Sequence, residues 1–513
     1  MAGRTLKTTV AGALLAIPVI FLATLLPRSD IGAQEFLDVN QRNADGSTAL
    51  QWAVYEGDFA EVSRLLDAGA DVSIANNYGA SPMGLAAEVA DTGILRLLLE
   101  AGADVDSPNP EGQTALMLVA RTGALDAAQL LLDHGATIDA REGWGGQTAL
   151  MWASARRHPR MMERLIEHGA DIDARSSRRD YQRHVQAEGR PKNLDTGGFT
   201  PLLYAARENC IACVDVLLAN GADIDLPDPD GVSPLHVAIM NANWDLAKQM
   251  IEVGADVNQW DIYGEAPLFT SLGNYTRING GRASIDPLNE TEGLDIVHML
   301  LDHGANPNMQ LFFKPSNVRG STNTRGSTPL IRAATNGDQE MVELLLEYGA
   351  DPTIYMADRQ TPIHAVLAGR SSEQQALDLI RIFYTAGTDI DVVALVNHRE
   401  EIRGGTALHY AVRKRYQEVI RELASYGIDI DAEDQDGLTA LDYTRSRGFM
   451  PFMALQTPRY EEEEALLREF GATSEMEREP LWPVLGPPQG VWADIWPLGE
   501  PRVHEPIYTH STY

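Results

Sequence analysis

Apolar residues recur along this chain in short stripes, and each stripe ends at a glycine. In the first stripe Val62, Leu65 and Leu66 are three and four residues apart, which places them on one face of an α-helix. Gly69 follows, and a glycine can take the left-handed conformation that ends a helix without steric cost. The pattern therefore predicts a helix before each of these glycines.

Eleven glycines close such stripes and set the period of the chain. The first four are 33, 33 and 34 residues apart, and later intervals are mostly longer. The full set is Gly69, Gly102, Gly135, Gly169, Gly221, Gly254, Gly304, Gly349, Gly387, Gly427 and Gly471. A regular period of this size is typical of a repeat protein, in which each unit packs only against its neighbours. We number the units 1 to 11 by these glycines.

A second signal marks the start of another helix in each unit. In ten of the eleven units a Ser or Thr is followed by Pro or Ala, as at Thr48-Ala49. The hydroxyl can cap a helix N-terminus, and Pro or Ala suits the first helical position. Unit 7 has Ala266 instead of the hydroxyl residue. Each unit is therefore predicted to contain a first helix, a tight loop and a second, glycine-capped helix.

This repeat resembles the ankyrin repeat over about residues 43–472. The likeness is greatest in the tetrapeptides Ser233-Pro234-Leu235-His236 and Thr406-Ala407-Leu408-His409. The resemblance implies an all-α-dominated repeat solenoid of stacked helix–loop–helix units with β-hairpin projections. It also implies that partners bind on the concave face and the hairpin tips. The arrangement is similar to that of large ankyrin proteins exported by bacteria.

Two segments flank the predicted solenoid of residues 34–472. Residues 1–33 contain Arg4 and Lys7, then an apolar run, then small residues, which is typical of an export signal peptide. An uncleaved membrane anchor is the alternative, because the run approaches the shortest length that spans a bilayer. We therefore expect an exported chain, periplasmic or secreted. Residues 473–513 form a Pro- and Trp-rich tail that either caps unit 11 or binds a partner.

The longer intervals predict insertions near residues 175–196, 274–292 and 309–325. Insertions in repeat arrays lie in loops, where binding residues often occur. From Arg175 to Lys192 the first insertion has six basic and two acidic residues. It is either a solvated loop or a site for an acidic partner.

The overall charge narrows the class of partner. The chain has 41 Lys and Arg against 73 Asp and Glu, which gives a net charge of −32. Because such a surface repels phosphate groups, we expect no nucleic-acid partner, and a membrane contact only if the N-terminal segment is uncleaved. We expect a monomer that binds a protein, with an acidic protein segment as one candidate.

Few residues indicate chemistry. Cys210 and Cys213 form a C-x-x-C at the start of a second helix, where a structural thiol pair or a disulfide is expected and a thiol-redox function is the alternative. The resemblance implies that His236, His364 and His409 brace neighbouring units, and they lie in separate units. The sequence lacks the common hydrolase, zinc-protease and phosphate-loop motifs. We therefore expect neither an enzyme nor a cofactor or metal.

The binding positions follow from the resemblance. The variable ends of the first helices are Tyr55, Glu56, Arg121, Thr122, Arg156, Arg207, Glu208, Met240, Asn241, Arg413 and Lys414, and the tips offer Tyr78, Trp144, Trp260 and Tyr263. Aromatic and Arg side chains commonly anchor interfaces. The predicted partner-binding residues are Trp144, Arg156, Arg178, Arg179, Arg183, Arg207, Trp260 and Tyr263. We interpret the chain as a non-enzymatic interaction scaffold of the cell envelope or exterior, with a secreted effector acting on host proteins as an alternative.

Overall fold

The computed structural model describes residues 38–178, 197–273, 289–312, 325–395, 404–445 and 460–473, together with strands β1 (Val185–Ala187) and β2 (Arg190–Lys192). The predicted export segment, the tail beyond Thr473 and much of each of the three insertions lie outside the described residues.

In the described part of the chain there are 22 α-helices, two for each of the eleven units. The first helices of the units, called inner helices, are α1 (Ala49–Glu56), α3 (Pro82–Val89), α5 (Ala115–Thr122), α7 (Ala149–Ala155), α9 (Pro201–Arg207), α11 (Pro234–Met240), α13 (Pro267–Ser271), α15 (Pro329–Asn336), α17 (Pro362–Ala368), α19 (Ala407–Lys414) and α21 (Ala440–Arg445). The second, outer helices are α2 (Phe59–Asp67), α4 (Thr92–Glu100), α6 (Leu125–Asp133), α8 (Pro159–Glu167), α10 (Ile211–Ala219), α12 (Trp244–Glu252), α14 (Gly293–Asp302), α16 (Gln339–Glu347), α18 (Glu373–Thr385), α20 (Gln417–Ser425) and α22 (Glu461–Glu469).

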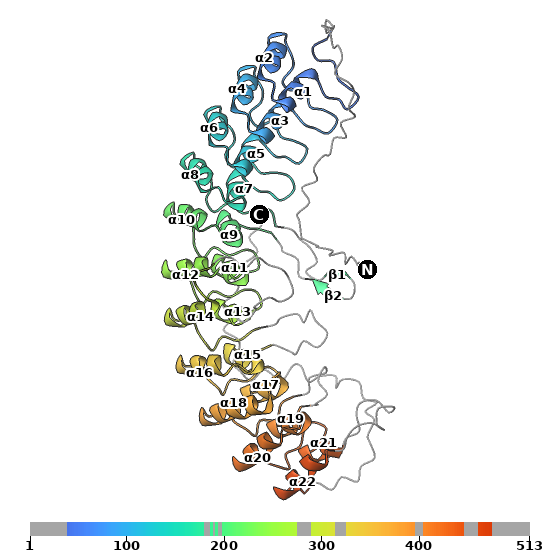
Figure 1. The fold of residues 1–513 in the computed structure, drawn as a ribbon, viewed down its shortest axis with the longest axis vertical. Helices are drawn as coiled ribbons and strands as arrows, with labels where there is room; N and C mark the ends of the chain where they lie inside the picture. Colours follow the sequence, from blue (N-terminus) through green and yellow to red (C-terminus); the bar gives the residue numbers. More distant parts are fainter. Residues whose placement is uncertain are drawn as a thin grey trace, which may run out of the picture.

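The helices stack into a bowed solenoid (Figure 1). The inner helices form one row and the outer helices a second row, and the loops between units project beyond the inner row on the inside of the bend. Each helix contacts its equivalents in the adjacent units; α5, for example, contacts α3 and α7. We call the side formed by the projecting turns and the ends of the inner helices the inner face. This architecture confirms the predicted repeat solenoid.

Local sequence fixes where each helix begins and ends. The Ser81 hydroxyl accepts a hydrogen bond from the Gly84 N–H at 3.1 Å, and Thr200 does the same for Leu203 at 3.2 Å. These bonds satisfy N–H groups that have no partner inside the helix. All eleven closing glycines have φ between +81° and +99°. The predicted start and stop signals are therefore confirmed.

The turns between units are tight rather than extended. In one of them the Asn76 N–H bonds the Ala80 carbonyl oxygen at 3.0 Å, and the Asn77 N–H bonds Asp45 of the preceding turn at 3.0 Å. In the described residues, named strands occur only in the basic insertion, where β1 and β2 pair antiparallel with Val185 opposite Lys192. The projections are thus hydrogen-bonded turns, and the basic insertion contains a short β-hairpin.

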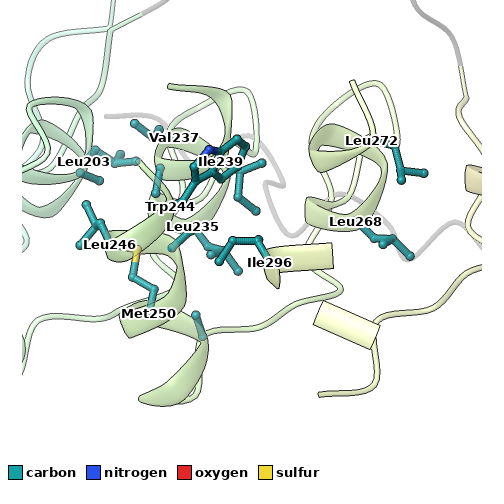
Figure 2. Close-up of a cluster of buried hydrophobic side chains, with 14 of the residues drawn as sticks. Leu203, Leu235, Val237, Ile239, Trp244, Leu246, Met250, Leu268, Leu272 and Ile296 are labelled. Atoms are coloured by element: carbon teal, nitrogen blue, oxygen red, sulfur yellow. The ribbon is translucent and has the colours of Figure 1, made fainter. Parts of the chain in front are cut away.

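One large hydrophobic core runs through the stacked units, from Leu50 in unit 1 to Ala472 in unit 11, with a small second cluster around Met151, Ala174 and Tyr204. Figure 2 shows part of it, where Leu203 of α9, Leu235 of α11 and Leu246 of α12 lie near one another. The apolar face of each unit is buried by the next, so no unit has a core of its own. Burial of these side chains stabilises the array by roughly 25 cal/mol per Å² of apolar surface.

A ladder of Asp and Asn side chains also joins successive units. Asp225 accepts the backbone N–H of Asp256 at 2.8 Å. One unit further on, Asn258 accepts the N–H of Asn306 at 2.7 Å and also donates to the Gly304 carbonyl oxygen at 2.9 Å. Burial, and more weakly the charge of Asp256, raise the pKa of Asp225, whereas the hydrogen bond from Asp256 lowers it. Because the net pKa shift is upward, the position favours an uncharged acceptor such as an amide over a carboxylate.

Two departures from the regular unit were not predicted. Helix α18 has 13 residues, against nine in α16 and α20. Helices α21 and α22 are separated by residues 446–460, a longer connection than in the regular units. The longer α18 accounts for the 38-residue interval that ends at Gly387, and the longer connection accounts for the 44-residue interval that ends at Gly471.

Candidate functional site

Equivalent positions of successive inner helices supply the inner face. The fourth residue of each helix and its last one or two residues lie on the same side, because residues three and four apart are neighbours on a helix. The fourth residue is Trp52 in α1, Trp152 in α7 and Tyr204 in α9. Aromatic rings therefore recur along the floor of this face, with charged residues at the helix ends beside them.

The most structured part of the inner face joins units 4 and 5. The Arg207 guanidinium carbon lies 5.0 Å from the centroid of the Tyr204 ring and 5.8 Å from that of Phe199. The Arg207 Nε also lies 2.9 Å from Glu208 Oε1. Gln147 donates a 2.6 Å hydrogen bond to the Tyr204 hydroxyl. These contacts hold an exposed guanidinium in place on an aromatic surface, as at many interface anchors.

Trp144 and Arg156 belong to the same stretch of the inner face. Trp144 stands at a turn with 69% of its surface exposed. The buried Glu142 carboxylate orders this turn by accepting the backbone N–H groups of Trp144 and Gly145 at 2.5 and 2.6 Å. Arg156 follows α7 as its C-cap and is exposed. Together with Arg207 they give one aromatic and two cationic side chains on neighbouring units.

The other predicted residues divide into three groups. Arg178 is exposed at the base of the basic insertion, where its backbone pairs with Gly197. Arg179 and Arg183 lie outside the described residues. Trp260 is half-buried and packs edge-on against Phe312, with ring centroids 5.1 Å apart.

Tyr263 is also half-buried, and its carbonyl oxygen accepts the Phe312 N–H at 2.8 Å. Trp260 and Tyr263 therefore expose less surface than Trp144 does, because both contribute to the joint between two neighbouring turns.

Several exposed apolar residues of units 1 and 2 were missed. Trp52, Phe59 and Val89 are 37%, 51% and 53% exposed. For Val89 the signal in the sequence is an apolar residue at a helix position where α5 has the polar Thr122. Trp52 gives no such signal, because most other units also have an apolar residue at its position. Periodicity assigns such residues to the core, because it does not distinguish the face toward the next unit from the open inner face.

Cys210 and Cys213 form a disulfide. Cys210 is the N-cap of α10, and its sulfur accepts the Cys213 N–H at 3.2 Å. In units 1, 2 and 8 the equivalent cap is an aspartate: Asp58, Asp91 and Asp338. The two cysteines are only 5% and 0% exposed, so an external thiol has little access to either sulfur. The geometry favours a structural role.

The remaining polar groups point to structural roles as well. The described part of the chain contains no group of three His, Cys, Asp or Glu side chains placed to hold a metal ion. His236 is buried, and burial lowers its pKa to about 4.

No helix in the described ranges is long and apolar enough to span a membrane.

Comparison with known proteins identifies a matching protein family and several similar proteins. A family profile described as "Ankyrin repeats (3 copies)" matches in overlapping segments at residues 24–109, 85–176, 184–261, 202–278, 288–393 and 367–448. Among curated proteins, the mouse B-cell lymphoma 3 protein homolog is 27% identical over 38% of this chain and 38% of its own length. The chicken nuclear factor NF-kappa-B p105 subunit is 30% identical over 44% of this chain and 20% of its own length.

A solved structure of the ankyrin repeat domain of Bcl-3 is 29% identical and covers 44% of this chain and 94% of that domain, with a TM-score of 0.38. The matches therefore span well under half of the length of the two curated relatives.

Proposed function

Since this chain belongs to the ankyrin-repeat family, a family of protein-interaction modules, we propose that it is a non-enzymatic scaffold that binds a partner protein on its inner face and turns. The observation that carries the proposal is the group formed by Trp144, Arg156 and Arg207 on units 4 and 5. The Arg207 side chain is held there by Tyr204, Phe199 and Glu208, the turn that carries Trp144 is ordered by Glu142, and Arg156 is exposed at the end of α7. Aromatic and Arg anchors of this kind dominate the binding energy of many interfaces.

The proposed site extends from unit 4 to unit 7 and includes the basic insertion. Although the whole chain has a net charge of −32, the arginines of this site attract carboxylates locally. The part of the partner that contacts the site is therefore acidic. We place the protein outside the cytoplasm, in the periplasm or in the medium, on the basis of the N-terminal pattern in residues 1–33. The buried disulfide fits an oxidising compartment.

Affinity capture from the native cells tests the proposal. The full tagged chain is compared with a Trp144→Ala/Arg156→Ala/Arg207→Ala variant. A matched control, Arg160→Ala/Lys248→Ala, removes the same positive charge from exposed positions of the outer helices α8 and α12. We expect one specific partner, reduced at least tenfold by the inner-face variant and unchanged by the control. Equal recovery with both variants would contradict the site, and recovery of no partner would contradict the scaffold.

The basic insertion needs a separate variant. Replacing Arg178, Arg179 and Arg183 by Ala should weaken capture of the same partner if the insertion contributes carboxylate contacts. Capture at the level of the unchanged chain would restrict the site to the helices.

Fractionation of the same cells tests the location. Recovery in the periplasm with a new N-terminus near Ala33 is the expected result. Recovery only in the medium would favour an effector acting on host proteins, and a membrane-bound full-length chain would favour the anchor.

A further inference from the structure

The inner face of units 1 to 5 carries opposite charges at its two ends. In units 1 and 2 the charged residues at the ends of the inner helices are Glu56 and Glu88, and both side chains are exposed. In units 3 to 5 the same two helix-end positions supply Arg121, Arg156 and Arg207, of which the first is half-buried and the other two are exposed. They also supply one carboxylate, Glu208, which pairs with Arg207 and leaves this end net positive. The sign of the charge therefore reverses between α3 and α5.

The acidic end also has unusual apolar exposure. Twelve large apolar side chains are exposed in the described part of the chain, and five of them lie between Trp52 and Val89. Tyr55 is 58% exposed and Val89 is 53% exposed. The Trp52 and Tyr55 rings meet edge-on, with centroids 6.1 Å apart. Exposed apolar surface concentrated in this way is typical of a binding site rather than of a random surface.

Each end fits one kind of side chain. Aromatic faces next to carboxylates attract Lys and Arg, through the ring quadrupole and through direct charge pairing. Arginine side chains bind the carboxylates of Asp and Glu, often by donating two parallel hydrogen bonds. A ligand that satisfies both ends must therefore be basic at one end and acidic at the other.

We propose that the inner face of units 1 to 5 binds one extended protein segment, with its Lys or Arg residues on Trp52, Tyr55, Glu56 and Glu88 and its Asp or Glu residues on Arg121, Arg156 and Arg207. This inference rests on the proposed scaffold function and adds the chemistry and the direction of the partner. Charge complementarity sets the direction, because the reverse alignment places like charges opposite each other at both ends.

The length of the segment follows from the stacking. Neighbouring helices pack about 8 to 10 Å apart, so the five units span about 40 Å. An extended strand rises about 3.3 Å per residue, which gives a segment of about 12 to 14 residues. A single short loop of a partner is too small to contact both ends.

Two synthetic peptides of the same composition test the proposal. Both have about 14 residues and a fluorophore; one has a block of Lys at one end and a block of Glu at the other, and the second alternates Lys and Glu. Fluorescence anisotropy with the full chain at low salt should show that the block peptide binds at least about tenfold tighter, and that added salt reduces the difference. Equal affinity of the two peptides would overturn the proposal.

Charge reversal provides the second test. Glu56→Lys/Glu88→Lys should weaken the block peptide about tenfold, and so should Arg121→Glu/Arg156→Glu. The four changes together should restore binding with the peptide reversed. A photo-crosslinker at the Lys end then reports direction: it should label α1 or α3 in the unchanged chain and α5 or α7 in the fourfold variant. Labelling of the same helices in both proteins, or no loss with either double variant, would overturn the proposal.

These outcomes separate the two proposals. If the native partner is captured through Trp144 and Arg207 but ignores reversal of Glu56 and Glu88, the directional site fails and the scaffold function stands. If no native partner is captured but the block peptide binds with the expected direction, the scaffold function fails and the polarised face stands. Circular dichroism of each variant checks that the helices are retained.

Discussion

The two halves of the solenoid share one architecture but join their units with different side chains. The third residue of the inner helix is histidine in units 6, 9 and 10, as in His364 and His409. In units 3 to 5 the same position holds Met117, Met151 and Leu203. Units 3 to 5 therefore rely on apolar packing at this position, whereas units 6, 9 and 10 bury a titratable ring. Either chemistry satisfies the fold, but only the second makes stability depend on proton concentration.

The buried histidines act as neutral bridges. His364 Nε2 donates to the Gly405 carbonyl oxygen at 3.1 Å, and its Nδ1 accepts from the Thr361 hydroxyl at 2.8 Å. His409 makes the same pair of contacts, with the Leu438 carbonyl oxygen and Thr406. Burial lowers the pKa of His364 to about 4, because the charged ring is poorly solvated there. Protonation of Nδ1 would remove its capacity to accept from Thr361, so the complete bridge requires a neutral imidazole.

The largest expected effect comes from removing such a bridge. His364→Ala should lower the free energy of unfolding by about 3 kcal/mol, because it leaves a cavity and an unpaired Gly405 carbonyl oxygen at a fully buried site. Urea unfolding of the full chain, with hydrogen exchange to locate the change in units 9 and 10, measures it. His298→Ala is the control, because His298 is exposed on α14. A loss no greater than that of the control would contradict the bridging role.

Acid should lower the stability of the histidine-containing units more than that of units 3 to 5. The folded-state pKa values of His236 and His364 are depressed to about 4 from 6.5. Their contribution is therefore fully present above about pH 6.5 and is lost as the pH falls toward 4, by up to about 1.4 kcal/mol per pH unit for each ring.

Hydrogen exchange at pH 7 and pH 5 measures this difference, in a range where most carboxylates remain ionised. Units 9 and 10 should lose protection before units 3 to 5. Loss of protection in both halves to the same extent would mean that the histidines do not distinguish them.

Much of the fold could be predicted because its signals are local. A capping hydroxyl such as that of Thr200 and a closing glycine such as Gly221 fix a helix end within a few residues of themselves. The helix boundaries of each unit can therefore be read from its own sequence. The long connection between α21 and α22 was not predicted, because an altered interval does not say which loop has grown.

The candidate site could be predicted less well than the fold, because the solvent exposure of a side chain depends on how the neighbouring units pack. Trp144 and Trp260 look alike in sequence, yet one is 69% exposed and the other packs against Phe312 from the following turn. Val89 fits a core stripe but faces outward. Only the stacked array shows which side of an inner helix is covered.

The boundary between the halves allows a smaller test. Cys210→Ala/Cys213→Ala should cost about 1 kcal/mol, because α10 loses its N-terminal cap, whereas Cys210→Asp/Cys213→Ala should recover most of that loss. Asp58 and Asp91 already cap α2 and α4 in this way. Thermal unfolding with and without reductant compares the variants, and the aspartate variant should not respond to reductant. Failure of aspartate to recover stability would show that the disulfide does more than replace a cap.

The smallest expected effect comes from the ladder of Asp and Asn side chains. Asp225 carries a raised pKa, so its protonated form stabilises the fold below the unfolded-state pKa and this stabilisation is lost as the pH rises through the folded-state value. Asp225→Asn should therefore raise stability at pH 7 by about 0.5 kcal/mol, a modest figure because the group is partly solvated. Asn258 already plays this role in the next unit.

Asp71→Asn provides a contrast outside the rungs. The Asp71 side chain accepts hydrogen bonds from Ser73 in its own turn, which lower the pKa of Asp71, so its charge is favourable. Melting curves at pH 7 and pH 3 should show a gain for the first variant and a loss for the second, and both differences should shrink in acid. Changes of the same sign at pH 7 would show that carboxylate charge does not distinguish the two positions.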